Sequence, residues 1–156
     1  MLKLSYSDYA ALRAHGEETY PHECCGVLLG NSTPDGNHVR QIVRAGNTRT
    51  DSAHNRYNIA PDELIRIQRQ ARKQGLDIVG FYHSHPDCPA LWSQTDFNEA
   101  HWVGCSYIIT RVDQGNAAVT NSFLLTGTSE EDKKFLDEPV EIAMNEAEID
   151  QEKGRS

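Results

Sequence analysis

Two histidines and an aspartate form the group of residues in this chain with the clearest chemical use. His83 and His85 are separated by one residue, and Asp96 follows eleven residues after His85. Two imidazoles and one carboxylate suit zinc, and a zinc ion held by three protein ligands keeps a fourth position for water or substrate. The sequence therefore predicts a catalytic zinc site, with one ion per chain and these three residues as ligands.

Amide hydrolysis at such a site also needs a group that takes a proton from water and passes it to the leaving amine. Glu23, in the sequence Pro-His-Glu-Cys-Cys-Gly of residues 21–26, is the candidate. It can reach the histidines only through a tertiary contact, so its spacing does not place it. Ser93 could hydrogen-bond an oxyanion. Its spacing to Asp96 also fits a variant of the helix capping box, and the two roles can coexist.

The elements around these residues explain how they could meet. Residues 76–83 predict a strand, and side chains two apart on a strand share a face, so both imidazoles can reach one ion. Residues 86–91 then predict a loop that returns to the start of a helix over about 93–103. Asp96 would lie in the first turn of that helix.

The rest of the chain alternates between helix and strand patterns. It predicts, in order, a helix over 8–19 capped by Ser7, a strand over 25–30, a turn over 31–37, a strand over 39–43, a loop over 46–56, a short strand over 57–59, a helix over 61–74, and strands over 105–112, 117–125 and 139–143. Several pairs of consecutive strands are predicted to form hairpins. The predicted fold is α/β, with one domain over residues 1–143 and a mixed, mainly antiparallel sheet. Residues 144–156 predict a flexible acidic tail.

Composition excludes several classes of function. The chain has 156 residues and a formal net charge of -8, and 38% of its residues are hydrophobic. The length suits one domain with its own core, and the negative charge argues against nucleic-acid binding. No apolar run approaches a membrane span, and residues 1–6 lack the apolar core of a signal peptide. A cytoplasmic location without membrane partners is therefore predicted.

The four cysteines predict reduced thiols, most of them buried. Cys24, Cys25, Cys88 and Cys105 form no Cys-x-x-Cys pair, which argues against a structural zinc held by thiolates. In a cytoplasmic chain a disulfide framework is not expected. Metal ligation by Cys88, which lies between the histidines and Asp96, is a minor alternative.

Glu23, the sequence His-Ser-His-Pro from His83 and the sequence Ser-x-x-Asp from Ser93 together resemble the JAMM motif of the MPN-domain metalloproteases. The resemblance covers roughly residues 1–125. Within that family, the compact length and the sequence Pro-His-Glu-Cys-Cys-Gly-Val-Leu-Leu-Gly are similar to the small prokaryotic branch. Trp92 departs from the proline that relatives often have before the serine. This difference bears on the shape of the cleft, because the ligand spacing is intact.

The resemblance implies a mixed sheet that curves around zinc and is flanked by helices, a core also found in cytidine deaminases. It implies His83, His85 and Asp96 as ligands, Glu23 as acid and base, and Ser93 as oxyanion support. The implied substrate is an amide bond at the C-terminus of a ubiquitin-like or sulfur-carrier protein, including a carrier–cysteine adduct. Its extended tail, ending in Gly-Gly, would pass between the loops over 46–56 and 86–92.

Other functions remain to be compared with this one. A non-catalytic MPN scaffold would typically have lost one of the five motif positions, all of which are present here. A zinc amidase acting on small molecules would use the same site. A zinc nucleoside deaminase would carry His-x-Glu and Pro-Cys-x-x-Cys, and this chain has neither. The sequence leaves a homodimer open.

Overall fold

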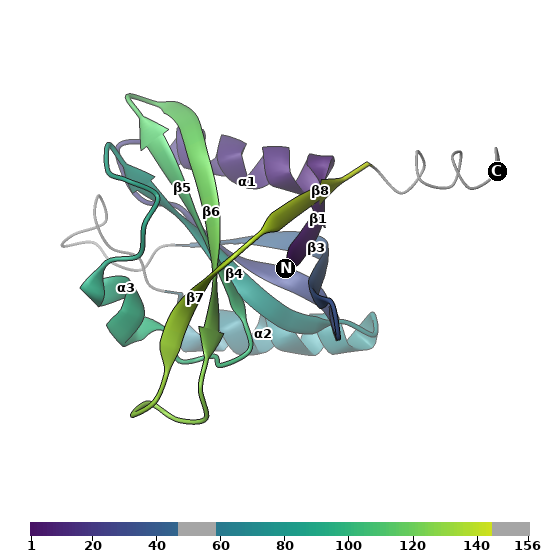
Figure 1. Cartoon of the computed structure of the whole chain (residues 1–156). Helices are drawn as coiled ribbons and strands as arrows, with labels where there is room; N and C mark the ends of the chain where they lie inside the picture. The colour runs from purple at the N-terminus through teal and green to yellow at the C-terminus, as the bar shows by residue number, and fades with distance from the viewer. Residues whose placement is uncertain (47–58, 145–156) are drawn as a thin grey trace, which may run out of the picture.

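One curled sheet forms the body of the protein in this computed structural model, which describes residues 1–46 and 59–144 (Figure 1). Its strands are β1 (Leu2–Ser5), β2 (Cys25–Thr33), β3 (Gly36–Ala45), β4 (Asp77–Pro86), β5 (Ser106–Asp113), β6 (Asn116–Thr126), β7 (Lys134–Glu138) and β8 (Val140–Ala143). The strand order is β7-β6-β5-β4-β2-β3-β1-β8. Pairing is antiparallel for β2–β3, β2–β4, β5–β6 and β6–β7, and parallel for β1–β3, β1–β8 and β4–β5. The predicted mixed, mainly antiparallel sheet is confirmed.

The sheet curls because consecutive strands occupy its two edges. Pro139 alone separates β7 from β8, so the chain crosses directly from one edge to the other. Figure 1 shows this crossing as a diagonal ribbon that runs from β7 to β8. The amide of Leu2 donates to the carbonyl of Pro139 at 2.9 Å, and the N-terminal amine pairs with Glu138. The first and last described strands therefore hold the curl together.

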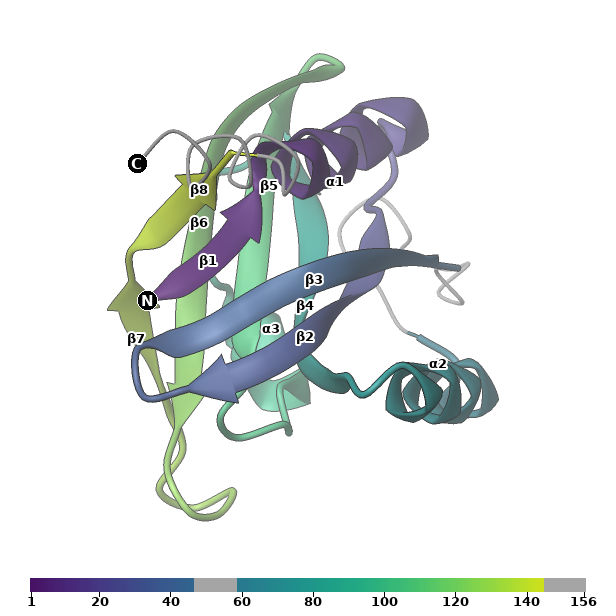
Figure 2. The same cartoon turned by 90° about the vertical axis from the view of Figure 1, so that its right-hand side faces the viewer.

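Helices cover opposite faces of the sheet, as Figure 2 shows for α1 (Tyr6–Thr19) and α2 (Pro61–Lys73). Side chains of β2 alternate between the two layers. Val27 packs in one buried cluster with Ile67 of α2, whereas Leu28 packs in another with Leu12 of α1. Because both faces of its first six residues are buried, β2 begins with a continuous apolar run over residues 25–30.

Several predicted element boundaries differ from the structure: β2 and β3 extend into the turn predicted over 31–37, and two helix boundaries are wrong. Ser5, and not Ser7, caps α1 by accepting a hydrogen bond from the amide of Asp8, because the preceding residues form β1 and the helix starts directly after it. The helix after Ser93 is α3 (Gln94–Glu99), which is shorter than predicted. The ammonium of Lys133 donates to the carbonyls of Phe97 and Ala100 and so stabilises the early end of the helix.

The remaining predictions concern the short strands and the segments that lie mostly outside the described residues. The strand predicted over 139–143 is β8, whereas β1 and β7 were not predicted. All but the first residue of the loop over 46–56, most of the short strand over 57–59 and all but one residue of the tail over 144–156 lie outside the described ranges. Ile59, the described end of that predicted strand, belongs to no strand. In the part of the chain described, none of the helices combines the length and apolar character needed to cross a bilayer.

Candidate metal centre

The two histidines lie at the end of β4, where the strand emerges from the middle of the sheet. β4 has β2 on one side and β5 on the other, so its backbone is held along its length. His83 and His85 point to the same face, and both side chains are buried. Their Nε2 atoms lie 3.1 Å apart. The strand therefore brings the two imidazoles together as the spacing predicted.

Asp96 reaches the histidines from the first turn of α3. Its Oδ1 lies 3.3 Å from Nε2 of His83, and its Oδ2 lies 3.1 Å from Nε2 of His85. The helix start fixes this carboxylate through a capping box. The amide of Ser93 donates to Oδ2 of Asp96 at 2.9 Å, and the amide of Asp96 donates to Oγ of Ser93 at 3.0 Å.

The separations between these three side chains fit a zinc ion. Ligand bonds of about 2.0–2.1 Å in a tetrahedral arrangement place neighbouring ligand atoms roughly 3.3 Å apart. The two Nε2 atoms lie 3.1 Å apart, and they lie 3.3 and 3.1 Å from Oδ1 and Oδ2 of Asp96, the two oxygens of one carboxylate. Nδ1 of His85 also contacts the carbonyl of Pro89 at 2.8 Å, which orients that ring with Nε2 toward the centre. The described residues thus form a donor set that could hold zinc.

Burial and the shared carboxylate set the charges of this group. Burial lowers the pKa of His83 more than Asp96 raises it, which favours the neutral imidazole that binds metals. Burial also opposes the charge on His85, but hydrogen bonds to Asp96 and Pro89 outweigh it and raise the pKa. For Asp96, burial is outweighed by His83 and by hydrogen bonds from His83, His85 and Ser93, so its pKa lies well below the usual range.

A second carboxylate, that of Glu23, adjoins the two imidazoles from the segment between α1 and β2. Glu23, His83 and His85 each offer a ligand atom within 4.8 Å of the others. Glu23 is buried, and this burial raises its pKa to about 8. A carboxyl group that exchanges its proton near neutral pH is suited to acid–base work. Asp96 differs because it bridges both imidazoles and carries a stabilised negative charge.

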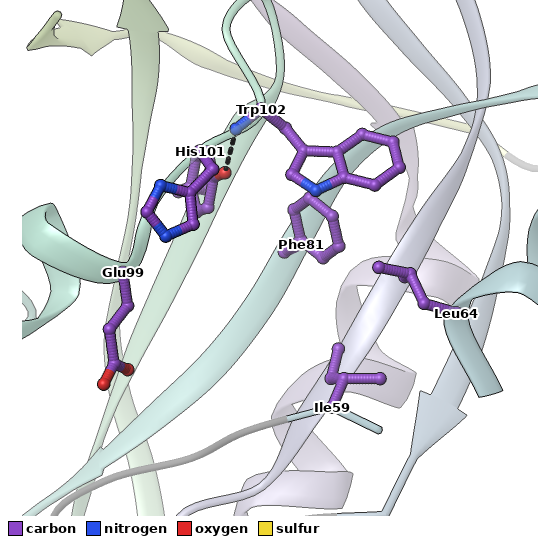
Figure 3. A pocket seen from close by; sticks show the side chains of 7 residues that line it. Ile59, Leu64, Phe81, Glu99, His101 and Trp102 are labelled. Carbon is purple, nitrogen blue, oxygen red and sulfur yellow. Dashed lines mark hydrogen bonds between the residues drawn. The ribbon is translucent and has the colours of Figure 1, made fainter. Parts of the chain in front are cut away.

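Two recesses flank the histidines along β4. Phe81, His83 and His85 are every second residue of the strand, so their side chains share one face. The recess beside Phe81, shown in Figure 3, has Ile59 and Leu64 on one side and Glu99 and His101 on the other. It is lined by Ile59, Leu64, Phe81, Glu99, His101, Trp102 and Tyr107.

Aromatic contacts hold the wall of this first recess. The ring of Trp102 packs edge-on against Phe81, with 5.4 Å between the ring centroids. The amide of Trp102 donates to the hydroxyl of Tyr107 at 3.2 Å, the dashed contact of Figure 3. Trp102 lies three residues after the end of α3. Its place beside the candidate centre depends on α3 ending early.

The second recess lies beyond His85, and three of the five motif residues line it. It is lined by Glu23, His85, Pro86, Cys88, Pro89, Leu91, Trp92 and Ser93. Trp92 and Leu91 are exposed apolar side chains at its edge. Cys88 is exposed, whereas Cys24, Cys25 and Cys105 are buried, as predicted for most of the thiols.

The family model described as prokaryotic homologues of the JAB domain matches residues 6–126. This chain belongs to that family. The matched range contains all five motif residues and the whole of the candidate centre, from Glu23 to Asp96. The predicted membership in the small prokaryotic branch of JAMM proteins is confirmed.

Curated relatives in this family carry names that refer to conjugated proteins. A desampylase of Haloferax volcanii is 37% identical over 95 residues, which are 60% of this chain and 65% of the relative. A probable TtuB-protein conjugate cleaving protease of Thermus thermophilus is 31% identical over 90 residues, or 58% of this chain and 57% of the relative. The aligned part of the chain thus spans less than two thirds of each relative.

Solved structures confirm the fold over nearly the whole chain. A solution structure of a Desulfitobacterium hafniense protein matches with a TM-score of 0.78 at 25% identity, covering 93% of this chain and 94% of the other. A solution structure from Salinibacter ruber matches with a TM-score of 0.68 at 36% identity, covering 92% of this chain and 93% of the other. The single curled α/β sheet is therefore the fold of this JAB-domain protein.

Proposed function

We propose that this JAB-domain protein is a zinc-dependent isopeptidase or peptidase that hydrolyses an amide bond at the C-terminus of a ubiquitin-like or sulfur-carrier protein. The observation that carries the proposal is the convergence of His83, His85 and Asp96 at separations close to those of zinc ligands, with the buried carboxylate of Glu23 beside them. The names of the two relatives support the substrate class.

Each motif residue has a separate task in this proposal. His83, His85 and Asp96 hold one zinc ion, which when bound supplies Lewis-acid activation of water and of the scissile carbonyl. Glu23 accepts a proton on its carboxylate and returns it to the leaving amine, for which its raised pKa is suited. The hydroxyl of Ser93 already accepts from the amide of Asp96, and its hydrogen remains for donation to the oxyanion.

The two recesses support an extended substrate that crosses the centre. Phe81 lines one recess and His85 lines the other. The two recesses therefore follow one another along β4, with His83 between them. A polypeptide laid along this face would place one amide bond at the histidines and side chains in both recesses. A narrow tail ending in Gly-Gly would pass the buried ligands most easily, because glycine has no side chain to clash with them.

The first experiment combines zinc analysis with cleavage of a sulfur-carrier protein that bears a peptide after its C-terminal Gly-Gly. Wild type should hold one zinc per chain and cleave the extension, and a chelator should abolish cleavage. Glu23→Gln should keep the zinc and lose cleavage. Zinc without cleavage of any carrier conjugate would contradict the substrate class and favour a small-molecule amidase or a scaffold. A chain that binds no zinc would overturn the proposal altogether.

A further inference from the structure

We propose that Ser84, the residue between the two histidines, is a positioning residue that holds the Glu23 segment against the ligand strand. The inference rests on the proposed function, because the place of Glu23 affects turnover only if Glu23 is the acid and base. Ser84 is fully buried. Side chains alternate along β4, so Ser84 points to the face opposite His83 and His85 and touches neither substrate nor metal.

The contact is a hydrogen bond between Oγ of Ser84 and the backbone of Cys24. The amide of Cys24 donates to Oγ of Ser84 at 2.8 Å, and the amide of Ser84 donates to the carbonyl of Cys24 at 3.3 Å. Cys24 directly follows Glu23. Ser84 therefore binds both polar backbone groups of the residue next to the proposed base.

This pair is where the ladder between β2 and β4 ends. Cys25 lies opposite His83 in the last backbone pair of these strands, so Cys24 and Ser84 come next. In a regular antiparallel ladder, Cys24 and Ser84 would form two hydrogen bonds, each from the amide of one residue to the carbonyl of the other. Here Oγ of Ser84 replaces one backbone acceptor. The chain therefore enters the sheet only after Cys24 while the Cys24 amide stays satisfied, and Glu23 lies just before β2 beside the histidines.

Helix α1 leaves Ser84 little freedom to move. Gly16 packs over the contact so closely that a Cβ added there would lie 3.2 Å from Cβ of Ser84 and 3.0 Å from Cγ2 of Val112. The same Cβ would lie 3.8 Å from Sγ of Cys24. The glycine thus lets the helix cover both partners of the hydrogen bond.

A second contact secures the other end of the Glu23 segment, and it is exposed. The hydroxyl of Tyr20 donates to Oδ2 of Asp87 at 2.5 Å. Asp87 directly follows β4 and has a positive φ of 54°. Its amide donates to the carbonyl of Val112, and the amide of Gln114 donates to its Oδ1. Residues 20–24 are thus tied at both ends to the exit of β4, and the buried Ser84 contact is the stronger because water does not compete for it.

Ser84→Ala tests the buried contact. It leaves the Cys24 amide buried without an acceptor, so the segment should shift. We expect kcat for the carrier–peptide fusion to fall by about 10²-fold, as for a misplaced catalytic group, with KM and zinc content unchanged. Ser106→Ala is the matched control, because Ser106 is equally buried and its Oγ accepts one bond, from Asn37, at the far end of β5. Its kcat should not change.

A double-mutant cycle separates positioning from general destabilisation. If Ser84 acts through Glu23, Ser84→Ala should not lower the residual kcat of Glu23→Gln any further. An equal loss in both backgrounds would overturn the proposal. Tyr20→Phe should lower kcat by only a few-fold. If Ser84→Ala does not fold, Ser84→Cys keeps the volume with a weaker acceptor, and wild-type kcat in that variant would also overturn it.

Amide hydrogen exchange gives a readout that needs no substrate. The Cys24 amide should exchange slowly in wild type and at least about 10-fold faster in Ser84→Ala, with the Ser106→Ala control unchanged. Unchanged exchange at Cys24 in Ser84→Ala would contradict the contact. If wild type cleaves no carrier conjugate while the exchange result holds, the proposed function fails and the contact stands.

Discussion

The two carboxylates of the candidate site reach it by different routes. Asp96 arrives with the histidines on one continuous segment, in which a strand end, a short loop and a capped helix bring both imidazoles and the carboxylate within 3.3 Å of one another. Glu23 arrives from a separate segment, between α1 and β2, and meets the histidines only because β2 pairs with β4.

This difference shows that the candidate site has a local part and a distant part. The local part is held by contacts within residues 83–96, including the capping box of Ser93 and Asp96. The distant part depends on the sheet register and on the packing of α1. Changes in the local part should therefore affect metal binding, whereas changes in the distant part should affect turnover with the metal in place.

His83→Ala should have the largest effect, because it removes a ligand from the local part. We expect zinc content to fall from about one per chain to near zero after dialysis, and cleavage to fall to background. Zinc analysis and the carrier-cleavage assay measure the two losses. His38→Ala, which changes a histidine at the start of β3, should retain zinc. Full zinc content in His83→Ala would remove His83 from the ligand set.

Glu23→Gln should separate the two parts most sharply. The neutral amide cannot exchange the proton, so kcat should fall by about 10²–10⁴-fold while zinc content stays at one per chain. Glu17→Gln, on the exposed side of α1, serves as the control and should keep wild-type kcat. Retained turnover in Glu23→Gln would exclude Glu23 from the mechanism, and loss of zinc would make it a ligand.

Ser93→Ala should have an intermediate effect, because Ser93 both caps α3 and faces the second recess. Loss of oxyanion support should lower kcat by about 10²–10³-fold. The lost cap should also destabilise the protein by about 1 kcal/mol. Ser5→Ala removes the equivalent cap of α1 and should cost similar stability without changing kcat. Equal kcat values for Ser93→Ala and Ser5→Ala would exclude oxyanion support by Ser93 and leave it only the role of a helix cap.

The pH dependence of stability should show the smallest effect, and it concerns the link between α1 and β4. Nδ1 of His15 contacts the hydroxyl of Tyr82 at 2.8 Å. Burial and then Arg44, partly offset by Glu18, lower the pKa of His15 to about 4. In the unfolded chain the pKa is about 6.5, so the unfolded state binds the proton first as pH falls.

The stability contributed by neutral His15 should therefore be complete above about pH 6.5 and be lost as pH falls toward about 4. Urea unfolding of the metal-free protein at several pH values measures it. His15→Gln should lose less stability over this interval than wild type, while both share the titration of the ligand histidines. Parallel losses in the two proteins would contradict the role of His15.

Prediction from the sequence succeeded where contacts are local. The strand before His83 and the helix start at Ser93 follow from alternation and capping, and the structure places His83, His85 and Asp96 together through them. The short strand β1 was missed because its residues pair only with segments far away in the chain. Strand β7 pairs with its neighbour β6, but its five residues include three charged ones and none is buried, so it lacks the apolar pattern of a strand. The early end of α3 depends on Lys133, which also lies far along the sequence.

The sequence by itself determined the identity and spacing of the proposed ligand residues, since strand periodicity and helix capping operate over a few residues. It also determined the family, through Glu23 and the motif around the histidines. Only the tertiary structure decided that Glu23 meets those histidines, that Ser84 binds the backbone next to it, and that two recesses flank the centre. The physical reason is that these contacts join strands and helices whose pairing is set by burial across the whole sheet.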